Sequence, residues 1–247
     1  MPRPIWFEIP ADDISRALKF YEDVFGWKAK KLEDMEYWMI DLPQAPMCVM
    51  GGAIMPRSMG NCVRNTIFTP SLDEYVAKVE AAGGKITAPR MEIPGGWWAG
   101  CTDPDGVEFG LMEAEPMDEA PPPLSGEPGP LLTIVHFEIP AEDLQRAITF
   151  YQTVFDWKIT KFEGPWEYWT VETGPADEPG MDGAIHARHQ HSCTSNTIRV
   201  GDIDEYLRKV QEAGGKVTMD KTFYEKVGHV AVCEDTEGNA FGLIQNA

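Results

Sequence analysis

One long segment of this chain occurs twice, and this repeat restricts the fold more than any other feature. The stretch WFEIPADDISRALKFYEDVFGWK, residues 6–28, returns as HFEIPAEDLQRAITFYQTVFDWK, residues 136–158. Two further segments return in the same order and at nearly the same spacing: 65–87 as 196–218, and 103–113 as 235–245. Self-similarity of this kind indicates duplicated structural units. We therefore expect two domains with the same fold.

A proline-rich segment, AEPMDEAPPPLSGEPGP, separates the two copies. It has no apolar periodicity, and its composition is typical of an extended tether. The sequence therefore predicts a first domain at residues 1–115, a linker at 116–130 and a second domain at 131–247. A chain of 247 residues is long enough for two ordinary domains.

Each copy reads as a strand, a helix and several strands, and then as the same series again. Ser71 and Glu74 form a capping box at the start of one helix, and Gly26 is placed to end another. Apolar residues at helical spacing mark the buried face of each helix. The helices are predicted at residues 12–25, 72–82, 142–155 and 203–213.

Short runs with alternating apolar residues surround these helices, among them EYWMIDL, GGAIM, KITAP and WWAGCTD. Such runs are typical of half-buried strands. The order is βαβββ twice in each domain, so the sequence predicts an α+β fold of four βαβββ modules. Paired modules of this kind make curved sheets, and the concave face of such a sheet encloses a cup, which is a natural ligand pocket.

The composition narrows the class of partner. The net charge of −19 excludes a basic surface for nucleic acid or for an anionic membrane, and it favours a neutral or cationic ligand. No apolar run approaches the roughly 20 residues that span a bilayer. Five cysteines without C-x-x-C spacing indicate reduced thiols, and we expect a cytoplasmic protein.

The repeated segments resemble the vicinal oxygen chelate superfamily, which includes glyoxalases, bleomycin resistance proteins and extradiol dioxygenases. The resemblance rests on EIPAEDLQRAITFYQTVFDWK, on the helix end EAGGK and on the final strand DPDG-x-x-FGL, each present twice in related form. It covers nearly all of the chain except the linker, and it implies a tandem glyoxalase-like protein. Members of this group include lyases, oxygenases, isomerases and binding proteins, so the fold does not settle the function.

The resemblance also implies where a metal would be held. The first ligand position falls on Trp6 in the first domain and on His136 in the second. The third position, allowing one gap, falls on Asn65 and Asn196, and the fourth falls on Gly110 and Gly242. Glycine has no side chain, and amide oxygens are poor ligands for Zn, Ni or Fe.

We therefore expect no cofactor and no family metal site. A divalent metal held by His136 and His186 in the second domain remains an alternative. All five histidines lie in that domain: His136, His186, His189, His191 and His229.

Tryptophans suggest the chemistry of the pocket. Trp6, Trp97 and Trp98 fall on strands that line the cup, whereas Trp27 and Trp157 are expected in the core. The alternative for the first three is that they only fill the barrel. The predicted ligand-binding residues are Trp6, Trp38, Asn65, Trp97, Trp98, His136, Trp169, Asn196 and His229. Aromatic walls suit a planar or cationic organic ligand.

The expected function is binding or detoxification of a small organic compound without the family metal site. The alternative is a glyoxalase-like lyase or a dioxygenase-type enzyme that uses a metal held by histidines of the second domain. An enzyme of this type would be lactoylglutathione-lyase-like or dioxygenase-like. The sequence leaves open whether the chain is catalytic, which cup is active, and whether it is a monomer or a homodimer.

Overall fold

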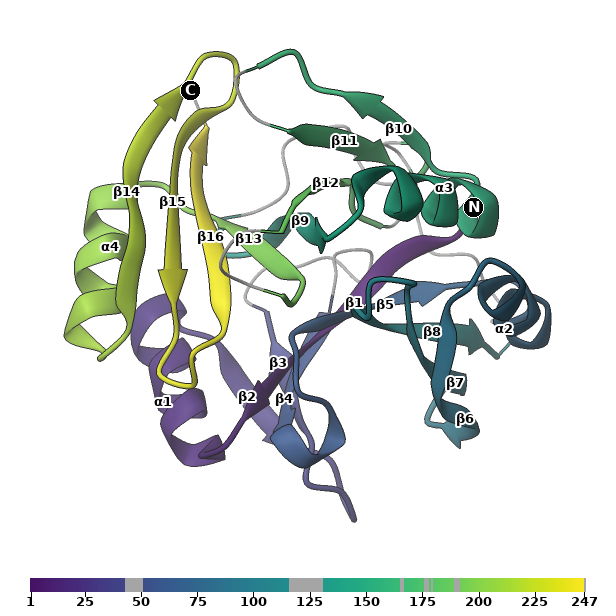
Figure 1. Cartoon of the computed structure of the whole chain (residues 1–247). Coiled ribbons are helices and arrows are strands. Elements are labelled where there is room, and N and C mark those ends of the chain that lie inside the picture. The colour runs from purple at the N-terminus through teal and green to yellow at the C-terminus, as the bar shows by residue number, and fades with distance from the viewer. Residues whose placement is uncertain are drawn as a thin grey trace. The chain divides into compact units, whose positions relative to one another are not determined.

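The computed structural model describes residues 1–42, 51–115, 131–164, 167–175, 178, 180–188 and 192–246. The predicted linker at 116–130 lies outside these ranges, as do His189 and His191. The described residues form an α+β fold with one mixed eight-stranded sheet in each half of the chain (Figure 1). The four predicted βαβββ modules are confirmed.

In the first half, the strand order is β2-β3-β4-β1-β5-β8-β7-β6. The elements in chain order are β1 (Arg3–Ala11), α1 (Ile14–Phe25), β2 (Lys28–Lys31), β3 (Trp38–Asp41), β4 (Gly51–Pro56), the 3₁₀ helix η1 (Arg57–Met59), β5 (Arg64–Phe68), α2 (Leu72–Ala81), β6 (Lys85–Ile93), β7 (Gly96–Thr102) and β8 (Glu108–Ala114).

The second half repeats this arrangement with the order β10-β11-β12-β9-β13-β16-β15-β14. The elements are β9 (Ile134–Ala141), α3 (Leu144–Phe155), β10 (Lys158–Lys161), β11 (Tyr168–Glu172), β12 (Gly183–Ala187), β13 (Ser195–Arg199), α4 (Ile203–Glu212), β14 (Lys216–Tyr224), β15 (Gly228–Glu234) and β16 (Ala240–Asn246).

The first helix of each half has well-defined ends. The carboxylate of Asp13 caps α1 and accepts a hydrogen bond from the N–H of Arg16 at 3.0 Å. Gly26 ends this helix with φ 68°, a left-handed conformation that favours glycine. In α3, Asp143 is the corresponding cap, and Asp156 takes the left-handed position with φ 59°. The observed helices agree closely with the predicted ones.

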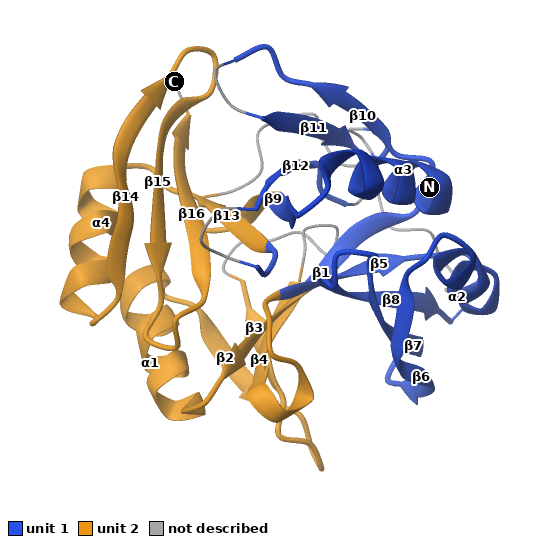
Figure 2. Ribbon diagram, in the orientation of Figure 1, with its two compact units in different colours: residues 1–6, 64–127, 137–194 blue, residues 7–63, 128–136, 195–247 orange. Residues whose placement is uncertain are grey.

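Packing groups the described residues into two interleaved units (Figure 2). Unit 1 comprises residues 1–6, 64–127 and 137–194, and unit 2 comprises residues 7–63, 128–136 and 195–247. Each unit therefore combines one helical module of the first half with one of the second: α2 with α3 in unit 1, and α1 with α4 in unit 2. The sheets follow the sequence repeat, whereas the packing of the helices does not.

The two units have matching aromatic cores. In unit 2, Tyr21 stacks on Trp27 with ring centroids 5.4 Å apart and an interplanar angle of 7°. In unit 1, Tyr151 stacks on Trp157 at 5.3 Å and 2°. Both tryptophans are almost fully buried, so their predicted role in the core is confirmed.

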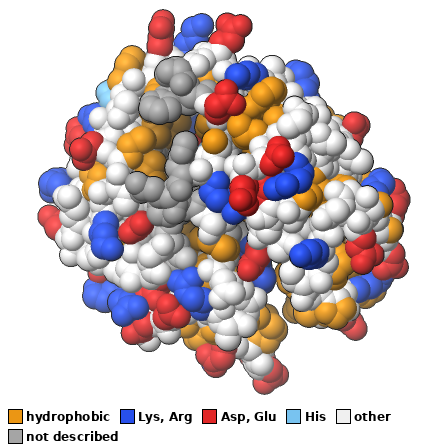
Figure 3. All heavy atoms as spheres, viewed as in Figure 1, with side chains coloured by type: hydrophobic (Ala, Val, Ile, Leu, Met, Phe, Trp, Pro, Cys, Tyr) orange, Lys and Arg blue, Asp and Glu red, His pale blue; other side chains and the backbone are white. Residues whose placement is uncertain are grey.

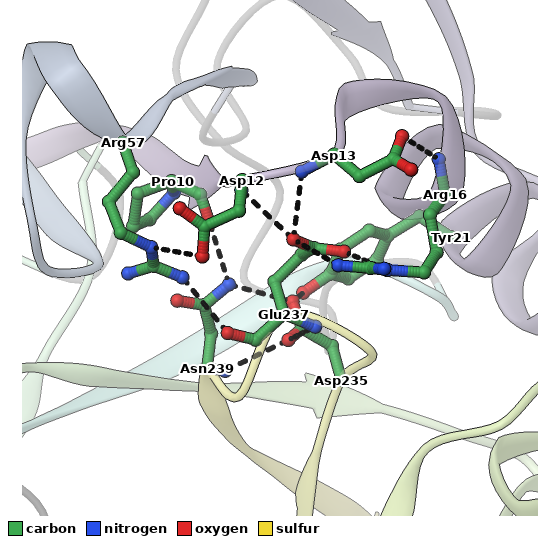
Figure 4. Close-up of polar contacts among 9 residues, drawn as sticks. All are labelled: Pro10, Asp12, Asp13, Arg16, Tyr21, Arg57, Asp235, Glu237 and Asn239. Carbon is green, nitrogen blue, oxygen red and sulfur yellow. Dashed lines mark hydrogen bonds and ion pairs between the residues drawn. The ribbon is translucent and has the colours of Figure 1, made fainter.

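A turn between two strands binds the start of a helix in unit 2 (Figure 4). Glu237, in the turn between β15 and β16, accepts hydrogen bonds from the backbone N–H groups of Asp12 and Asp13 at 2.9 and 3.0 Å. Arg16 also donates to this carboxylate at 2.6 Å. A negative charge at a helix N-terminus satisfies N–H groups that have no partner within the helix. The turn and the helix are therefore held as one piece.

The same turn contains a second, more deeply buried carboxylate. Asp235 accepts a hydrogen bond from the hydroxyl of Tyr21 at 2.9 Å and from the amide of Asn239 at 2.8 Å. Asn239 also donates to the carbonyl of Pro10 at 2.9 Å. We call this arrangement of a turn with two carboxylates against a helix the carboxylate clasp.

Unit 1 contains a second carboxylate clasp. Asp105 accepts from the N–H groups of Glu142 and Asp143 at 2.7 and 3.0 Å, and Arg146 donates to it at 2.6 Å. Asp103 and the hydroxyl of Tyr151 are 3.2 Å apart. The repeated DPDG and DTEG motifs thus have a structural role in both units.

The two carboxylates of the clasp in unit 2 respond differently to their surroundings. Burial raises the pKa of Asp235, and the hydrogen bonds from Asn239 and Tyr21 only partly oppose this effect. Burial would also raise the pKa of Glu237, but the hydrogen bonds from Arg16 and from the helix N–H groups outweigh it, and the pKa of Glu237 is lowered. The pKa of Asp105 in unit 1 is also lowered, because the hydrogen bonds from Arg146 and from the helix N–H groups outweigh the effect of burial.

We expect Glu237→Gln to destabilise the protein by about 1–3 kcal/mol at pH 7, because it removes charge-assisted hydrogen bonds. A depressed pKa stabilises the fold above the unfolded value of about 4.3 and ceases to do so as the pH falls through the folded value. The difference in the free energy of unfolding between the wild type and the variant should therefore become smaller as the pH falls. Urea unfolding at pH 7 and below pH 4 measures this. Glu225→Gln, in an exposed turn, is the control, and an equal loss in that variant would contradict the clasp.

Candidate functional site

Two paired glycines mark the first candidate site, in unit 1. We call the face of a sheet that lies away from its helices the open face. Gly100 of β7 pairs with Gly110 of β8, and Gly110 pairs with Thr66 of β5. Trp98 lies two residues before Gly100 and so shares its face. Ala99, between them, is fully buried on the helix side.

The indole of Trp98 lies over these glycines. A Cβ atom at Gly110 would be 2.5 Å from its Nε1 atom, and one at Gly100 would be 2.9 Å from its Cη2 atom. Nε1 donates to the hydroxyl of Thr66 at 3.3 Å. A side chain at position 110 would therefore displace the indole. The residues present here do not fit the metal ligand that the family carries at this position.

Cations from the same chain lie over four of the predicted tryptophans. The guanidinium of Arg64, a buried side chain, is 4.8 Å from the ring centroid of Trp98. This distance falls within the range of cation–π attraction. The other pairs are Arg90 over Trp97 at 4.9 Å, Lys31 over Trp38 at 5.1 Å and Lys161 over Trp169 at 5.8 Å. An external cation would have to compete with these contacts.

Trp97 and His229 lie on the helix side of their sheets, opposite to the open face. Trp97 precedes Trp98 in β7 and pairs with Glu113, whose carboxylate accepts from the N–H of Leu72 at the start of α2, at 2.7 Å. His229 pairs with Gln245, which accepts from the first N–H of α4 at 3.0 Å. Both residues therefore lie near helix starts and not in the cup.

Asn65 and Asn196 also lie on the helix side. They are 5% and 4% exposed, and each directly precedes a threonine that pairs with Gly110 or Gly242. Asn65 lines a small internal cavity of unit 1 together with Ile67 and Phe109. The threonines Thr66 and Thr197, not the asparagines, reach the open face.

Trp38 and Trp169 occupy matching positions in β3 and β11. Trp38 pairs with Ile54, and Trp169 pairs with Ile185. Both isoleucines are almost fully buried in the helix-side core. The two tryptophans thus lie at the margins of the core, below Lys31 and Lys161.

Trp6 and His136 are the predicted residues that lie on the open faces together with Trp98. Each directly precedes a buried phenylalanine of the helix side, Phe7 or Phe137, so alternation places it on the other face. Both are half-buried. In the second half, Val230 stands where the first half has Trp98, and a Cβ at Gly242 would be 2.4 Å from the hydroxyl of Thr197.

Among the described residues, no group of three or more His, Cys, Asp or Glu side chains could hold a metal ion. His186, on β12, has its Nδ1 atom 2.9 Å from the carbonyl of Ala187. His189 and His191, which follow His186 closely in the sequence, lie outside the described ranges.

The cysteines within the described ranges offer no nucleophile at either sheet. Cys101 and Cys233 are free and fully buried, and burial raises the pKa of both thiols to about 12. Cys62 and Cys193 are disulfide-bonded, so the prediction of reduced thiols is wrong for these two.

Acidic and basic side chains are interspersed over the face of the described residues shown in Figure 3. The negative net charge is therefore not gathered into one acidic patch on this face. None of the described helices is long and apolar enough to cross a membrane.

The duplicated βαβββ modules and their mixed sheets define a tandem protein of the α+β class. The Glyoxalase/Bleomycin resistance protein/Dioxygenase superfamily matches residues 133–243, and the Bleomycin resistance protein-like N-terminal family matches residues 3–43. The chain belongs to the glyoxalase/bleomycin resistance/dioxygenase superfamily, as its sequence predicted.

Similar proteins extend over both halves. The chain is 27% identical to "Putative glyoxylase CFP32" of Mycobacterium tuberculosis, over 99% of this chain and 95% of that protein. It is 23% identical to "Anthracycline biosynthesis protein DnrV" of Streptomyces peucetius, over 98% and 92%. The structure of the Mn(II)-bound glyoxalase from Novosphingobium aromaticivorans has the same fold, with a TM-score of 0.68, 15% identity, and coverage of 100% of this chain and 85% of that one.

Protein purified without a His-tag should contain no stoichiometric Zn, Ni, Mn or Fe, because Gly110 and Gly242 supply no ligand at the family position. Elemental analysis by mass spectrometry measures this directly. The same measurement on His136→Ala shows whether any metal that is found depends on this histidine. Stoichiometric metal in the wild type that disappears in the variant would contradict the prediction.

Proposed function

We propose that this chain binds a small organic compound on the open face of its first-half sheet, and that it acts by binding or detoxification without the family metal. The observation that carries this proposal is the indole of Trp98, which covers Gly110 where a ligand side chain would project. A large aromatic side chain in this place provides apolar contact surface where the family carries a metal ligand.

The geometry supports a planar aromatic ligand over a cationic one at this sheet. Trp98 is held by the hydroxyl of Thr66 and by Arg64, so it is a rigid part of the surface. Because Arg64 already lies over its ring, a ligand cation gains little there. Trp6 adds a second ring on the same face. The similarity to a protein named for anthracycline biosynthesis also supports an aromatic ligand.

Trp98→Val should weaken binding of a planar aromatic compound by about tenfold or more, because it removes a large rigid contact surface. Valine is the residue that the second half carries at this position. Isothermal titration calorimetry with a panel of neutral planar aromatics measures the affinities. Trp97→Val is the matched control, since Trp97 lies on the helix side. If Trp97→Val abolishes binding and Trp98→Val does not, the ligand lies elsewhere.

The alternative function is that of a glyoxalase-like enzyme with a metal in the second half. It is favoured by the full-length similarity to a protein named as a glyoxylase, and by the position of His136 on the open face. His136 and His186 are the residues proposed to hold the metal. Metal-dependent conversion of the methylglyoxal–glutathione adduct, lost in His136→Ala, would support this alternative over the binding protein.

A further inference from the structure

We propose that the open face of the second-half sheet, within unit 1, holds a second ligand site in which Glu138 binds a cationic amine. Glu138 lies on β9, and its neighbours Phe137 and Ile139 are buried on the helix side. Alternation therefore places Glu138 on the open face. The site goes beyond the proposed function, and it rests on that function only in taking an open face as the ligand-binding surface.

The register of three strands brings polar groups together around this carboxylate. Ala184 of β12 pairs with Glu138, and His186 of β12 pairs with Tyr168 of β11. The hydroxyl of Tyr168 donates to Oε1 of Glu138 at 3.0 Å. Ala184 ends at its Cβ atom, so at this register β12 contributes no long side chain over the carboxylate.

The charge of Glu138 is balanced by no cation among the described residues. Its hydrogen-bond partner there is the neutral hydroxyl of Tyr168, which leaves Oε2 for a ligand. The side chain is half-buried, so it has lost part of its hydration. A ligand ammonium would replace the lost hydration with a charge-assisted hydrogen bond, which is about twice as strong as a neutral one. The net charge of −19 attracts such a ligand at long range.

The first half shows why this site belongs to the second half alone. Glu8 accepts from Tyr37 at the same distance, 3.0 Å, in unit 2. Glu8 is only 5% exposed, however, and Met55, fully buried, stands where the second half has the half-buried His186. The duplicated pair is therefore enclosed in one copy and accessible in the other.

The test uses the full chain and three probes of one shape: 1-naphthylmethylamine, 1-naphthylmethanol and 1-naphthoate. Calorimetry should show that the wild type binds the cationic amine about tenfold more tightly than the neutral alcohol, and the anionic naphthoate least. Glu138→Gln should bring the affinity for the amine down to that for the alcohol, because glutamine keeps the shape and the contact with Tyr168 but removes the charge.

Two control variants distinguish a site at Glu138 from nonspecific attraction by negative charge and from binding at the first-half sheet. Glu167→Gln removes one exposed negative charge beside Tyr168 and should leave the preference for the amine intact. Trp98→Val should weaken the binding of all three naphthyl probes to the first-half sheet alike, since Trp98 belongs to that sheet, and it should not remove the preference for the amine over the alcohol.

Equal losses in Glu138→Gln and Glu167→Gln would show a general effect of charge and would overturn the site. So would loss of the preference for the amine in Trp98→Val, or wild-type amine binding in Glu138→Gln. If no naphthyl compound binds, the second site is refuted. The proposed function is judged separately, by the comparison of Trp98→Val with Trp97→Val.

Discussion

The structure depends on buried carboxylates that join a strand turn to the start of a helix. Removing a carboxylate from water costs several kcal/mol unless hydrogen bonds replace the lost hydration. In unit 2, Tyr21 and Asn239 supply these bonds to Asp235, and helix N–H groups supply them to Glu237. The partners come from opposite ends of the sequence, so the clasp forms only when both halves have folded together.

Much of the fold could be predicted because its signals are local and occur twice. Helix periodicity, caps such as Asp13 and strand alternation each act within a few residues. The grouping into interleaved units could not be predicted, because the contact between Tyr21 and Asp235 spans most of the chain. No short pattern in the sequence indicates which turn will meet which helix.

The face of the sheet on which each candidate residue lies could be predicted only in part from the sequence. Trp97 and Trp98 were assigned to one cup, although neighbouring residues of a strand point to opposite faces. The same rule separates Asn65 from Thr66. The position of Arg64 over Trp98 could not be predicted from alternation, because it depends on which strands pair.

The two faces of each sheet differ in what they contribute. The helix side carries the packing contacts, so the two halves can differ in the residues of their open faces. On the helix side, a clasp and a stacked Tyr–Trp core occur in both units. On the open face, both halves have glycine at the family's last ligand position, yet only the first places a tryptophan over it. A glycine at this position therefore does not by itself determine which side chain lies over it on the open face. Because these stabilising contacts lie on the helix side, substitutions on the open face can change its chemistry without loss of the fold.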